Sequence, residues 1–358
     1  MPKKFTYAAT GVNRELRAKS KKTLRILKNT YDFSHHGRIQ HLPYGNIFPA
    51  GQDRYLDLQI EGVGTKVLVA QLARKYDTIG IDAIAMAVND VIRSGAKPFA
   101  IVDNIHTKSS DPTLLSDLLT GIVEGAKEAE CIVPSGETGD VAEIIKGLTE
   151  NEGFDIVAAA IGEVTRNRII HGTDIRPGDT IIGMQSSGLH SNGISLARRI
   201  LFRQWGGRYE PDQTPKELGR KIVLEVLEPT KIYVKPFLKV AEQLHVKAAV
   251  HITGDAYLKF DRLTKYSKEI GFEFNNFKPQ PVFDLIQKTA HELGGTIADG
   301  EMFKTFNMGW GFAIIVGKTD EAEALEILEK AGTHSERIGR ITAEKGIIIS
   351  YRKKKMHF

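Results

Sequence analysis

Four of the acidic residues in one mostly apolar segment between positions 61 and 108 could hold a cation: Glu61, Asp82, Asp90 and Asp103. Ile, Ala, Met and Val surround two of them. A buried carboxylate costs on the order of several kcal/mol unless it is paired or holds a metal ion. Because Mg²⁺ prefers oxygen ligands, the segment predicts a magnesium site. For each carboxylate taken singly, a helix cap or an ion pair is the alternative.

A glycine turn begins this segment, with the sequence Glu-Gly-Val-Gly-Thr-Lys at positions 61 to 66. Gly62 and Gly64 allow the backbone to approach an anion, and Lys66 can neutralise it beside Thr65. A Walker sequence has four residues between its first glycine and Gly-Lys-Ser/Thr, and this turn does not. The turn therefore predicts contact with nucleoside triphosphate phosphates, but not a P-loop kinase.

A second candidate for phosphate contact is the loop from Ser186 to Gly193, which precedes an amphipathic segment. Ser187, His190 and Asn192 bring a hydroxyl, an imidazole and an amide to the start of a predicted helix. Helix N-termini favour anions. We predict that His190 donates a hydrogen bond or carries a proton. The alternative is an ordinary serine-rich turn capped by Asn192.

Two further turns carry acids, Glu137 after Gly136 in SGETGD and Asp255 after His251 in HITGD. A triphosphate cannot lie near several carboxylates without a cation between them. We therefore expect a set of acids to gather around Mg²⁺ that bridges the ATP phosphates: Glu61, Asp90, Asp103, Glu137 and Asp255.

The first half of the chain reads as alternating strands and helices. The predicted strands cover 54–60, 98–107, 131–138 and 154–164, and the predicted helices cover 12–29, 65–76, 80–96 and 111–130, the last with Asp111 as N-cap. Residues 30–53 are expected to form a long ordered loop. On the helix at 80–96, Asp82, Asn89 and Arg93 share one face beside Asp90, and this polar seam is expected to face the site.

The second half is also α/β. We expect a domain boundary between about 163 and 175, giving an N-terminal ATP-binding and dimerisation domain at 1–168 and a C-terminal α/β domain at 169–358. The predicted helices include 215–227, 230–245, 281–293 and 319–331, and the predicted strands include 248–255, 271–276, 335–341 and 346–351.

Composition limits the class of protein. The chain has 358 residues, 41% hydrophobic and 26% charged, with a net charge of +5. No apolar run has the length of a membrane span and no signal peptide is apparent, so we expect a cytoplasmic protein without membrane contact. The single cysteine, Cys131, cannot form an internal disulfide. The basic stretches at 19–28 and 353–355 leave nucleic-acid binding as an alternative, with no stacking motif to favour it.

Several long motifs resemble one family. EGVGTK, GIDAIAMAVNDVIRSGAKPFAIVDNI, SGETGD, SSGLHSNGISLARRIL, LEPTKIYVKP, HITGD and EMFKTFNMGWG occur in the order found in aminoimidazole ribonucleotide synthetase, also called phosphoribosylformylglycinamidine cyclo-ligase. The resemblance runs from about Tyr7 to the C-terminus. It implies two α/β domains, with the N-terminal sheet forming a barrel across a homodimer.

The resemblance also implies an activity in purine biosynthesis. ATP with Mg²⁺ would activate the formyl amide oxygen of formylglycinamidine ribonucleotide as a phosphate ester, and the amidine nitrogen would then close the imidazole ring. On the matching motifs we expect Lys66 and His190 to be catalytic. The residues expected to bind the cofactor are Gly62, Gly64, Thr65, Asn89, Gly136, Ser187 and Asn192.

The sequence departs from the family pattern at Glu61, where aspartate is usual, at Ser135 to Val141, and at Asp255, where the family continues with glycines. Because of these departures, two related kinds of enzyme remain as alternatives: formylglycinamidine synthetase-like and thiamine monophosphate kinase-like enzymes. Selenophosphate synthetase uses a reactive cysteine or selenocysteine near the N-terminus. Here no cysteine precedes Cys131, so that family is a poor fit. The hydrogenase-maturation relative ends in cysteine, whereas this sequence ends in Phe358.

Overall fold

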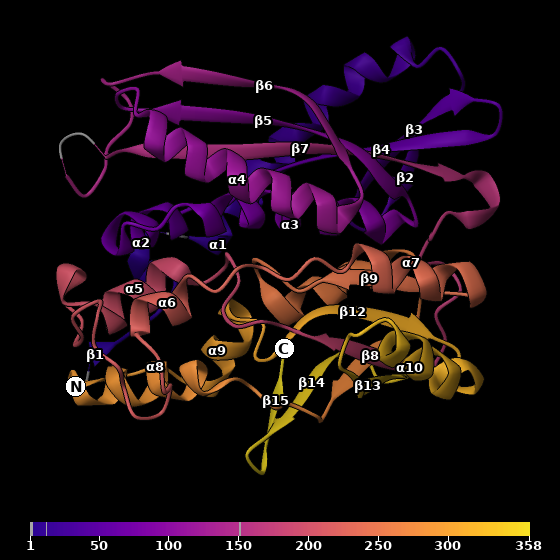
Figure 1. The fold of residues 1–358 in the computed structure, drawn as a ribbon. Helices are drawn as coiled ribbons and strands as arrows, with labels where there is room; N and C mark the ends of the chain where they lie inside the picture. Colours follow the sequence, from indigo (N-terminus) through magenta and orange to yellow (C-terminus); the bar gives the residue numbers. More distant parts are fainter. Residues whose placement is uncertain (1–2, 12, 150–151) are drawn as a thin grey trace.

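The structure is a computed structural model that describes residues 3–11, 13–149 and 152–358. It consists of two α/β layers stacked on one another, and each layer is built on its own large sheet (Figure 1). Three helices of the first layer lie between the two sheets. The predicted two-part α/β architecture is therefore confirmed.

The first layer contains a six-stranded sheet in the order β2–β3–β4–β7–β5–β6. Its strands are β2 (Gln40–Leu42), β3 (Gly45–Gly51), β4 (Arg54–Gly62), β5 (Lys97–Thr107), β6 (Ile132–Asp140) and β7 (Phe154–Thr165). The prediction of a loop over 30–53 was wrong for β2 and β3. These strands form because β3 pairs antiparallel with β4 and buries Ile47, contacts that local periodicity does not reveal.

Helices α2 (Lys66–Ala73), α3 (Asp77–Val91) and α4 (Pro112–Ala129) cover one face of this sheet. Asp111 caps α4 as predicted, accepting hydrogen bonds from the backbone N–H groups of Thr113 and Leu114. Helices α3 and α4 approach closely where glycines meet: a Cβ built on Gly121 would lie 1.7 Å from the Asp77 carbonyl oxygen. This contact fixes how α3 lies over the sheet.

The opposite face of the six-stranded sheet is apolar and open. Strand β4 alternates strictly, so that Tyr55 and Asp57 are buried while Leu58 and Ile60 are 55% and 68% exposed. Phe99 and Val102 on β5 and Ile132 on β6 are exposed as well. Helices α2, α3 and α4 lie on the other side of the sheet (Figure 1).

The second layer contains a seven-stranded sheet in the order β15–β14–β10–β13–β8–β12–β9. Its strands are β8 (Thr180–Gln185), β9 (Ala248–His251), β10 (Gly271–Phe274), β12 (Trp310–Val316), β13 (Ser335–Thr342), β14 (Gly346–Tyr351) and β15 (Lys354–His357). Strands β8 and β12 are buried almost throughout, which explains their continuous apolar sequences.

The helices of this layer are α5 (Ile194–Leu201), α6 (Ile222–Val226), α7 (Val234–Gln243), α8 (Pro281–Glu292), α9 (Asp299–Thr305) and α10 (Glu321–Lys330). The helix predicted over 215–227 was wrong at its start. Gly219 has a φ of +67°, which breaks the helix, so only α6 forms. The alternative in which Asn192 caps α5 was also wrong, because Gly193 holds the N-cap position without a side-chain cap.

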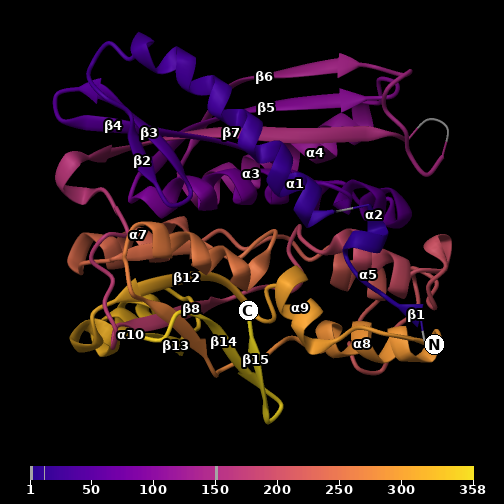
Figure 2. The ribbon, with the colours of Figure 1, turned by 180° about the vertical axis from the view of Figure 1, so that it is seen from behind.

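The N-terminal segment connects both layers. Strand β1 (Lys3–Lys4) pairs with β11 (Gly295–Thr296), and α1 (Arg14–Lys21) then runs from the second layer towards the six-stranded sheet (Figure 2). The helix predicted over 12–29 ends earlier than expected, because a 3₁₀ segment, Lys22–Phe33, continues from α1. Among the described residues, no helix is long and apolar enough to cross a membrane.

Candidate functional site

The predicted polar seam of α3 is present and faces the second layer. Asp82, wholly buried, accepts hydrogen bonds from the backbone and side chain of Thr230 at 2.7 and 2.6 Å. Lys66, also wholly buried, lies 2.7 Å from the other oxygen of Asp82 and donates to the Glu228 carbonyl oxygen. The seam therefore fastens the first layer to the segment before α7.

Asn89, about two turns after Asp82 on α3, continues this contact both as a hydrogen-bond donor and as an acceptor. Its side-chain amide donates to the Lys231 carbonyl oxygen at 2.9 Å, and its carbonyl oxygen accepts from the backbone N–H of Tyr233 at 2.8 Å. Both of its polar groups are thus used by the interface. Asn89 belongs to the joint between the layers and not to an open pocket.

Asp90 lies where the polar seam of α3 reaches an open pocket. Its carboxylate lies 2.7 Å from Arg93 and 2.8 Å from Nδ1 of the buried His251. Burial alone would raise the pKa of Asp90, but the Arg93 charge and the hydrogen bond from His251 hold that pKa below its ordinary range. Asp90 is therefore a fixed negative charge at neutral pH.

A pocket opens at this point between the two layers, under the N-terminal segment. It is lined by Tyr7, Arg17, Lys21, Tyr44, Gln59, Glu61, Met86, Asp90, Arg93, Asn192, Thr253, Gly254, Asp255, Lys259 and Arg262. Five of these residues are basic and three are acidic. The pocket combines an excess of positive charge, which suits an anionic ligand, with carboxylates that suit a divalent cation.

Glu61 is an acid of this pocket whose pKa is raised. Burial raises the pKa of Glu61, and the negative charge of Asp90 raises it further, while Lys259 and Arg93 act in the opposite direction. Two carboxylates this close are stabilised when a cation lies between them. Glu61 and Asp90 therefore form a donor pair that fits Mg²⁺.

Lys259 is a buried cation on the floor of the pocket. Its ammonium group donates to the His251 carbonyl oxygen at 3.1 Å and to the Thr253 hydroxyl. Burial lowers the pKa of Lys259 to about 8, although Asp90 favours its charged form. Lys259 is thus positioned by backbone and hydroxyl groups and keeps its charge available to a ligand.

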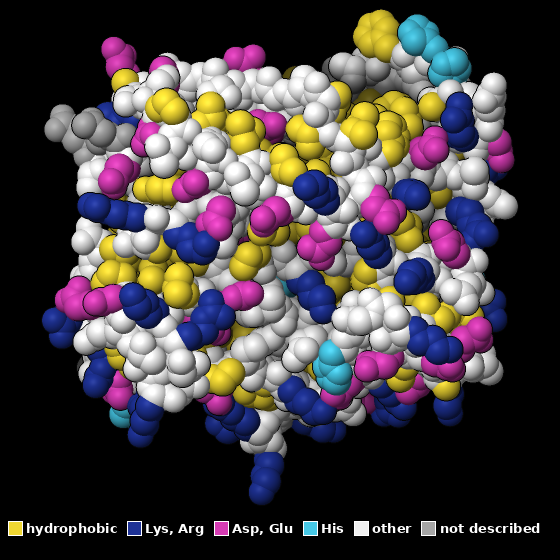
Figure 3. All heavy atoms as spheres, viewed as in Figure 1, with side chains coloured by type: hydrophobic (Ala, Val, Ile, Leu, Met, Phe, Trp, Pro, Cys, Tyr) yellow, Lys and Arg dark blue, Asp and Glu magenta, His cyan; other side chains and the backbone are white. Residues whose placement is uncertain are grey.

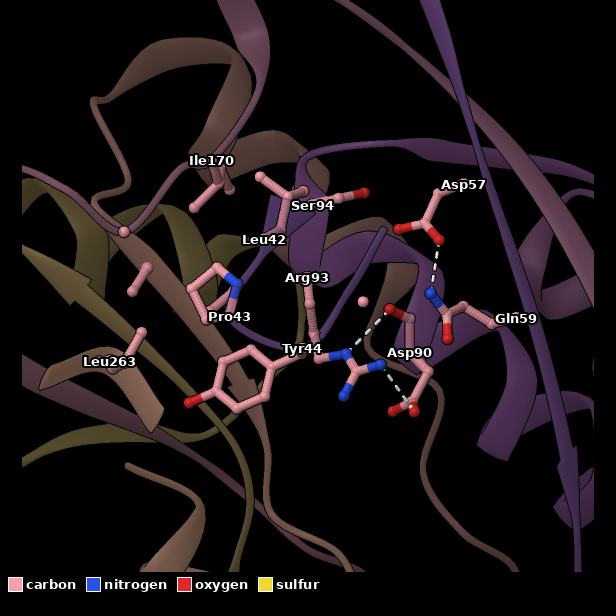
Figure 4. A pocket seen from close by; sticks show the side chains of 14 residues that line it. Leu42, Pro43, Tyr44, Asp57, Gln59, Asp90, Arg93, Ser94, Ile170 and Leu263 are labelled. Atoms are coloured by element: carbon pink, nitrogen blue, oxygen red, sulfur yellow. Dashed lines mark hydrogen bonds and ion pairs between the residues drawn. The ribbon is translucent and has the colours of Figure 1, made fainter. Parts of the chain in front are cut away.

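A smaller cavity adjoins the pocket and shares Tyr44, Gln59, Asp90 and Arg93 with it. Figure 4 shows the Arg93 guanidinium between Asp90 and the Tyr44 ring, while Gln59 donates to Asp57. The Arg93 guanidinium carbon lies 5.3 Å from the centre of the Tyr44 ring. These contacts hold Arg93, and through it Asp90, in a fixed position.

Most of the serine-rich loop is folded against the joint, and of its residues Asn192 lines the pocket. The Ser187 backbone N–H donates to Nε2 of His190, and Ser187 Oγ donates to the Pro229 carbonyl oxygen. Burial lowers the pKa of His190 well below its ordinary value, with His251 and Lys66 adding to the shift. His190 is therefore neutral, with Nδ1 carrying the hydrogen.

The structure brings some of the predicted residues together and separates others. Glu61, Asp90, Asp255 and Asn192 all line the pocket. Lys66, Asn89, Ser187 and His190 lie behind it in the joint, where Thr65 also contacts Ser195. Gly62 ends β4, and Gly64 lies in the turn that follows, with a φ of +58°.

Asp103, Gly136 and Glu137 lie on the neighbouring strands β5 and β6, away from the residues that line the pocket. A Cβ on Gly136 would lie within 2.5 Å of the Asp103 carboxylate, so these two residues pack directly together. Within residues 3–11, 13–149 and 152–358, no group of three or more His, Cys, Asp or Glu is arranged to hold a metal ion. The five predicted acids do not form one cluster.

Sequence reasoning missed most of the basic residues of the pocket: Arg17, Lys21, Lys259 and Arg262. Lys259 and Arg262 follow the HITGD motif, so extending that motif by a few residues would have found them. Arg17 and Lys21 stand on a segment with only a thin apolar stripe, which gave no sign of contact with a site.

Two family models match the chain: "AIR synthase related protein, N-terminal domain" over residues 45–164, and "AIR synthase related protein, C-terminal domain" over residues 176–352. Among curated proteins, phosphoribosylformylglycinamidine cyclo-ligase of Pyrococcus furiosus is 39% identical and covers 96% of this chain and 99% of its own length. The same enzyme of Pyrococcus horikoshii is 39% identical and covers 91% of this chain and 92% of its own length.

Solved structures support the fold. The HypE–HypF complex aligns over 95% of this chain and 98% of its own with a TM-score of 0.60 at 16% identity. T. maritima PurL complexed with ADP aligns over 92% of this chain with a TM-score of 0.58 at 13% identity, and this chain spans 47% of the PurL chain. With the family models and the near full-length relatives, they lead to one conclusion: the chain belongs to the AIR synthase related family, beside curated phosphoribosylformylglycinamidine cyclo-ligases.

Proposed function

We propose that this protein is an ATP-dependent cyclo-ligase that converts formylglycinamidine ribonucleotide to aminoimidazole ribonucleotide in purine biosynthesis. The observation that carries the proposal is the pocket between the layers, where five basic residues surround three carboxylates. Such a set of charges suits phosphorylated molecules and a divalent cation. The curated relatives carry the name of this enzyme over nearly their whole length.

The proposed reaction suits a pocket that supplies position and charge. An amide oxygen is a poor leaving group, whereas phosphate is a good one, so transfer of the terminal phosphate to the formyl oxygen prepares ring closure. The amidine nitrogen then attacks the formyl carbon that carries the phosphorylated oxygen. This step forms the carbon–nitrogen bond of the ring and releases phosphate. Basic side chains around the reacting groups stabilise the charge that develops on the phosphate oxygens.

Mg²⁺ would be held by Glu61 and Asp90, with Asp255 at the edge of the same pocket. The cation would neutralise charge on the ATP phosphates. Asp90 is kept ionised by Arg93 and His251, so it offers a permanent negative charge. Asp103 and Glu137 remain proposed ligands whose participation requires the β5–β6 edge to approach the phosphates.

Lys66 and His190 remain proposed catalytic residues, with the roles that the glycine turn and the serine loop suggest. Their burial behind the pocket favours action through the residues that they hold in place. The proposed binding set keeps Gly62, Gly64, Thr65, Asn89, Gly136, Ser187 and Asn192, of which Asn192 lies in the pocket. We also propose that the chain has two domains, 1–168 and 169–358, and that the protein is cytoplasmic.

A homodimer is part of the proposal. The outer face of the six-stranded sheet exposes Leu58, Ile60 and Phe99, and a second copy laid against it would bury them in a barrel formed by the two sheets.

The test is incubation of the purified protein with formylglycinamidine ribonucleotide, ATP and Mg²⁺, followed by assay for the aminoimidazole product and ADP. We expect both products in equal amounts. ADP without the aminoimidazole would indicate another ATP-dependent member of the family. A folded protein that forms neither product would overturn the proposal.

A further inference from the structure

Helix α1 has an unusual orientation on the protein. Arg14, Arg17 and Lys21 stand at i, i+3 and i+7, so they share one face, while Leu16 is 60% exposed. A surface helix normally turns its apolar side chains inwards. Here the helix turns basic residues towards the pocket between the layers, which calls for a reason other than core packing.

Arg14 has partners that hold the helix in this position. It lies 3.3 Å from Asp255 and 3.3 Å from Glu301, and it donates to the Lys304 carbonyl oxygen at 2.7 Å. The Tyr7 backbone N–H also donates to Glu301 at 3.0 Å. The segment is therefore anchored on α9 before it passes over the pocket.

Arg17 and Lys21 reach the rim of the pocket opposite a second basic pair. Lys259 and Arg262 lie on the 3₁₀ segment Ala256–Lys265, three residues apart, so they point to the same side. Lys259 is only 8% exposed. In the part of the chain that the structure describes, none of these four residues forms an ion pair with a carboxylate.

The four cations repel one another, and the pocket acids Glu61, Asp90 and Asp255 offset that repulsion only in part. The proximity of Arg262 and Arg17, added to burial, lowers the pKa of Lys21. An anion with several oxygens would relieve this repulsion and could accept hydrogen bonds from all sides. A phosphate group has that charge and shape.

We propose that Arg17 and Lys21 of α1, with Lys259 and Arg262 opposite, bind a phosphate group of the ligand in this pocket. The inference rests on the proposed function for the nature of the ligand. The phosphate belongs either to the ribonucleotide substrate or to the nucleotide, and these two sources are separated by experiment. The N-terminal segment is then part of the binding site and not a surface appendage.

The test compares the double variant Arg17→Gln/Lys21→Gln with a matched control, Lys19→Gln, which removes a charge from an exposed position of the same helix. Binding of ADP with Mg²⁺ and binding of formylglycinamidine ribonucleotide are measured separately by calorimetry. We expect Kd for one of the two ligands to rise at least about tenfold in the double variant, the scale of lost charged hydrogen bonds. Lys19→Gln should change neither Kd by more than about twofold.

The ligand whose Kd rises identifies the source of the phosphate. The single variant Lys21→Arg, with Arg17 unchanged, keeps both positive charges and should retain most of the affinity for that ligand. Unchanged Kd values for both ligands in the double variant would overturn the proposal, even if the enzyme still formed product. Failure of the wild type to form the aminoimidazole would count against the proposed function alone, because the ADP measurement still tests the basic residues.

Discussion

At the scale of single residues, the two pocket carboxylates Glu61 and Asp90 have pKa values shifted in opposite directions. The two acids differ in environment: Asp90 contacts Arg93 and His251, whereas Glu61 is half-buried without an equally close cation. One carboxylate, that of Asp90, thus serves as a fixed charge, while the other, that of Glu61, has a raised pKa. A bound cation would favour ionisation of Glu61.

We predict that Glu61→Gln raises the Mg²⁺ concentration needed for half-maximal activity. The pKa of Glu61 is raised in the folded protein, so its contribution to stability is present below its ordinary value of 4.5 and is lost as the pH rises through the raised pKa. Glutamine resembles the protonated form. The ligand-free variant should therefore not melt at a lower temperature at pH 7.

Measurement of Mg²⁺ activation and of thermal melting checks this prediction. In the wild type, the Mg²⁺ requirement should also increase as the pH falls through the raised pKa, because protons compete with the cation. A lower melting temperature with unaltered Mg²⁺ dependence would instead make Glu61 a structural ion-pair partner.

Lys66 and Asp82 give a second prediction at this scale. Removal of one partner of a buried pair leaves an uncompensated charge, so Lys66→Met should lower the free energy of unfolding by about 3–5 kcal/mol. The double variant Lys66→Met/Asp82→Leu should lose less than the sum of the single variants. Urea unfolding measures both.

The exposed pair Lys75–Asp77 provides the control, since Lys75→Met should cost no more than about 1 kcal/mol. Equal losses for Lys66→Met and Lys75→Met would show that burial does not decide the effect. Loss of turnover in Lys66→Met without loss of stability would support the direct catalytic role that the glycine turn suggested.

At the scale of elements, α3 carries the structure of the site. One face packs on the sheet and α4, while the other supplies Asp82, Asn89 and Asp90 to the second layer. The sequence predicted this polar seam correctly, because a helical repeat of polar residues in apolar surroundings is visible without tertiary contacts. It could not identify the partners of the seam, since Thr230, Tyr233 and His251 are far away in sequence.

We predict that Gly121→Ala destabilises the protein, because the added methyl group would collide with the Asp77 carbonyl oxygen of α3. Overpacking of this kind costs about 1–3 kcal/mol. The control is Thr120→Ala on the exposed side of α4, which should leave the melting temperature nearly unchanged. An unaltered melting temperature for Gly121→Ala would mean that the two helices separate easily.

Strands β2 and β3 show the limit of prediction from sequence at the same scale. Their residues have no clear period, and they become strands through pairing with β4. The pocket residue Tyr44 lies in the turn between them. A tertiary contact thus positions a residue that local sequence placed in a loop.

At the scale of the whole molecule, apolar surface points to assembly. The sphere view shows hydrophobic side chains over the first layer, where Leu119 and Val123 of α4 are exposed (Figure 3). The larger apolar face is the outer side of the six-stranded sheet, which bears Leu58, Ile60 and Phe99. The apolar sequences of 97–105 and 154–164 are typical of strands that are buried on both faces, and yet one face of the sheet is open in the single chain.

We predict a homodimer in solution at micromolar concentration, measured by light scattering as twice the monomer mass. Leu58→Glu should convert it to a monomer, because it would place a charge in the apolar interface. The control Leu24→Glu changes an equally exposed leucine of the N-terminal segment and should leave the dimer intact. A monomeric wild type would contradict the proposed barrel.

The pairing of β1 with β11 has a consequence for synthesis of the protein. Residues 3 and 4 lie beside residues 295 and 296, so the earliest described part of the chain finds its place only after most of the rest has left the ribosome. Arg14 likewise depends on Glu301. A nascent chain therefore carries α1 unanchored until late in translation, and the pocket acquires its last wall at the end of folding.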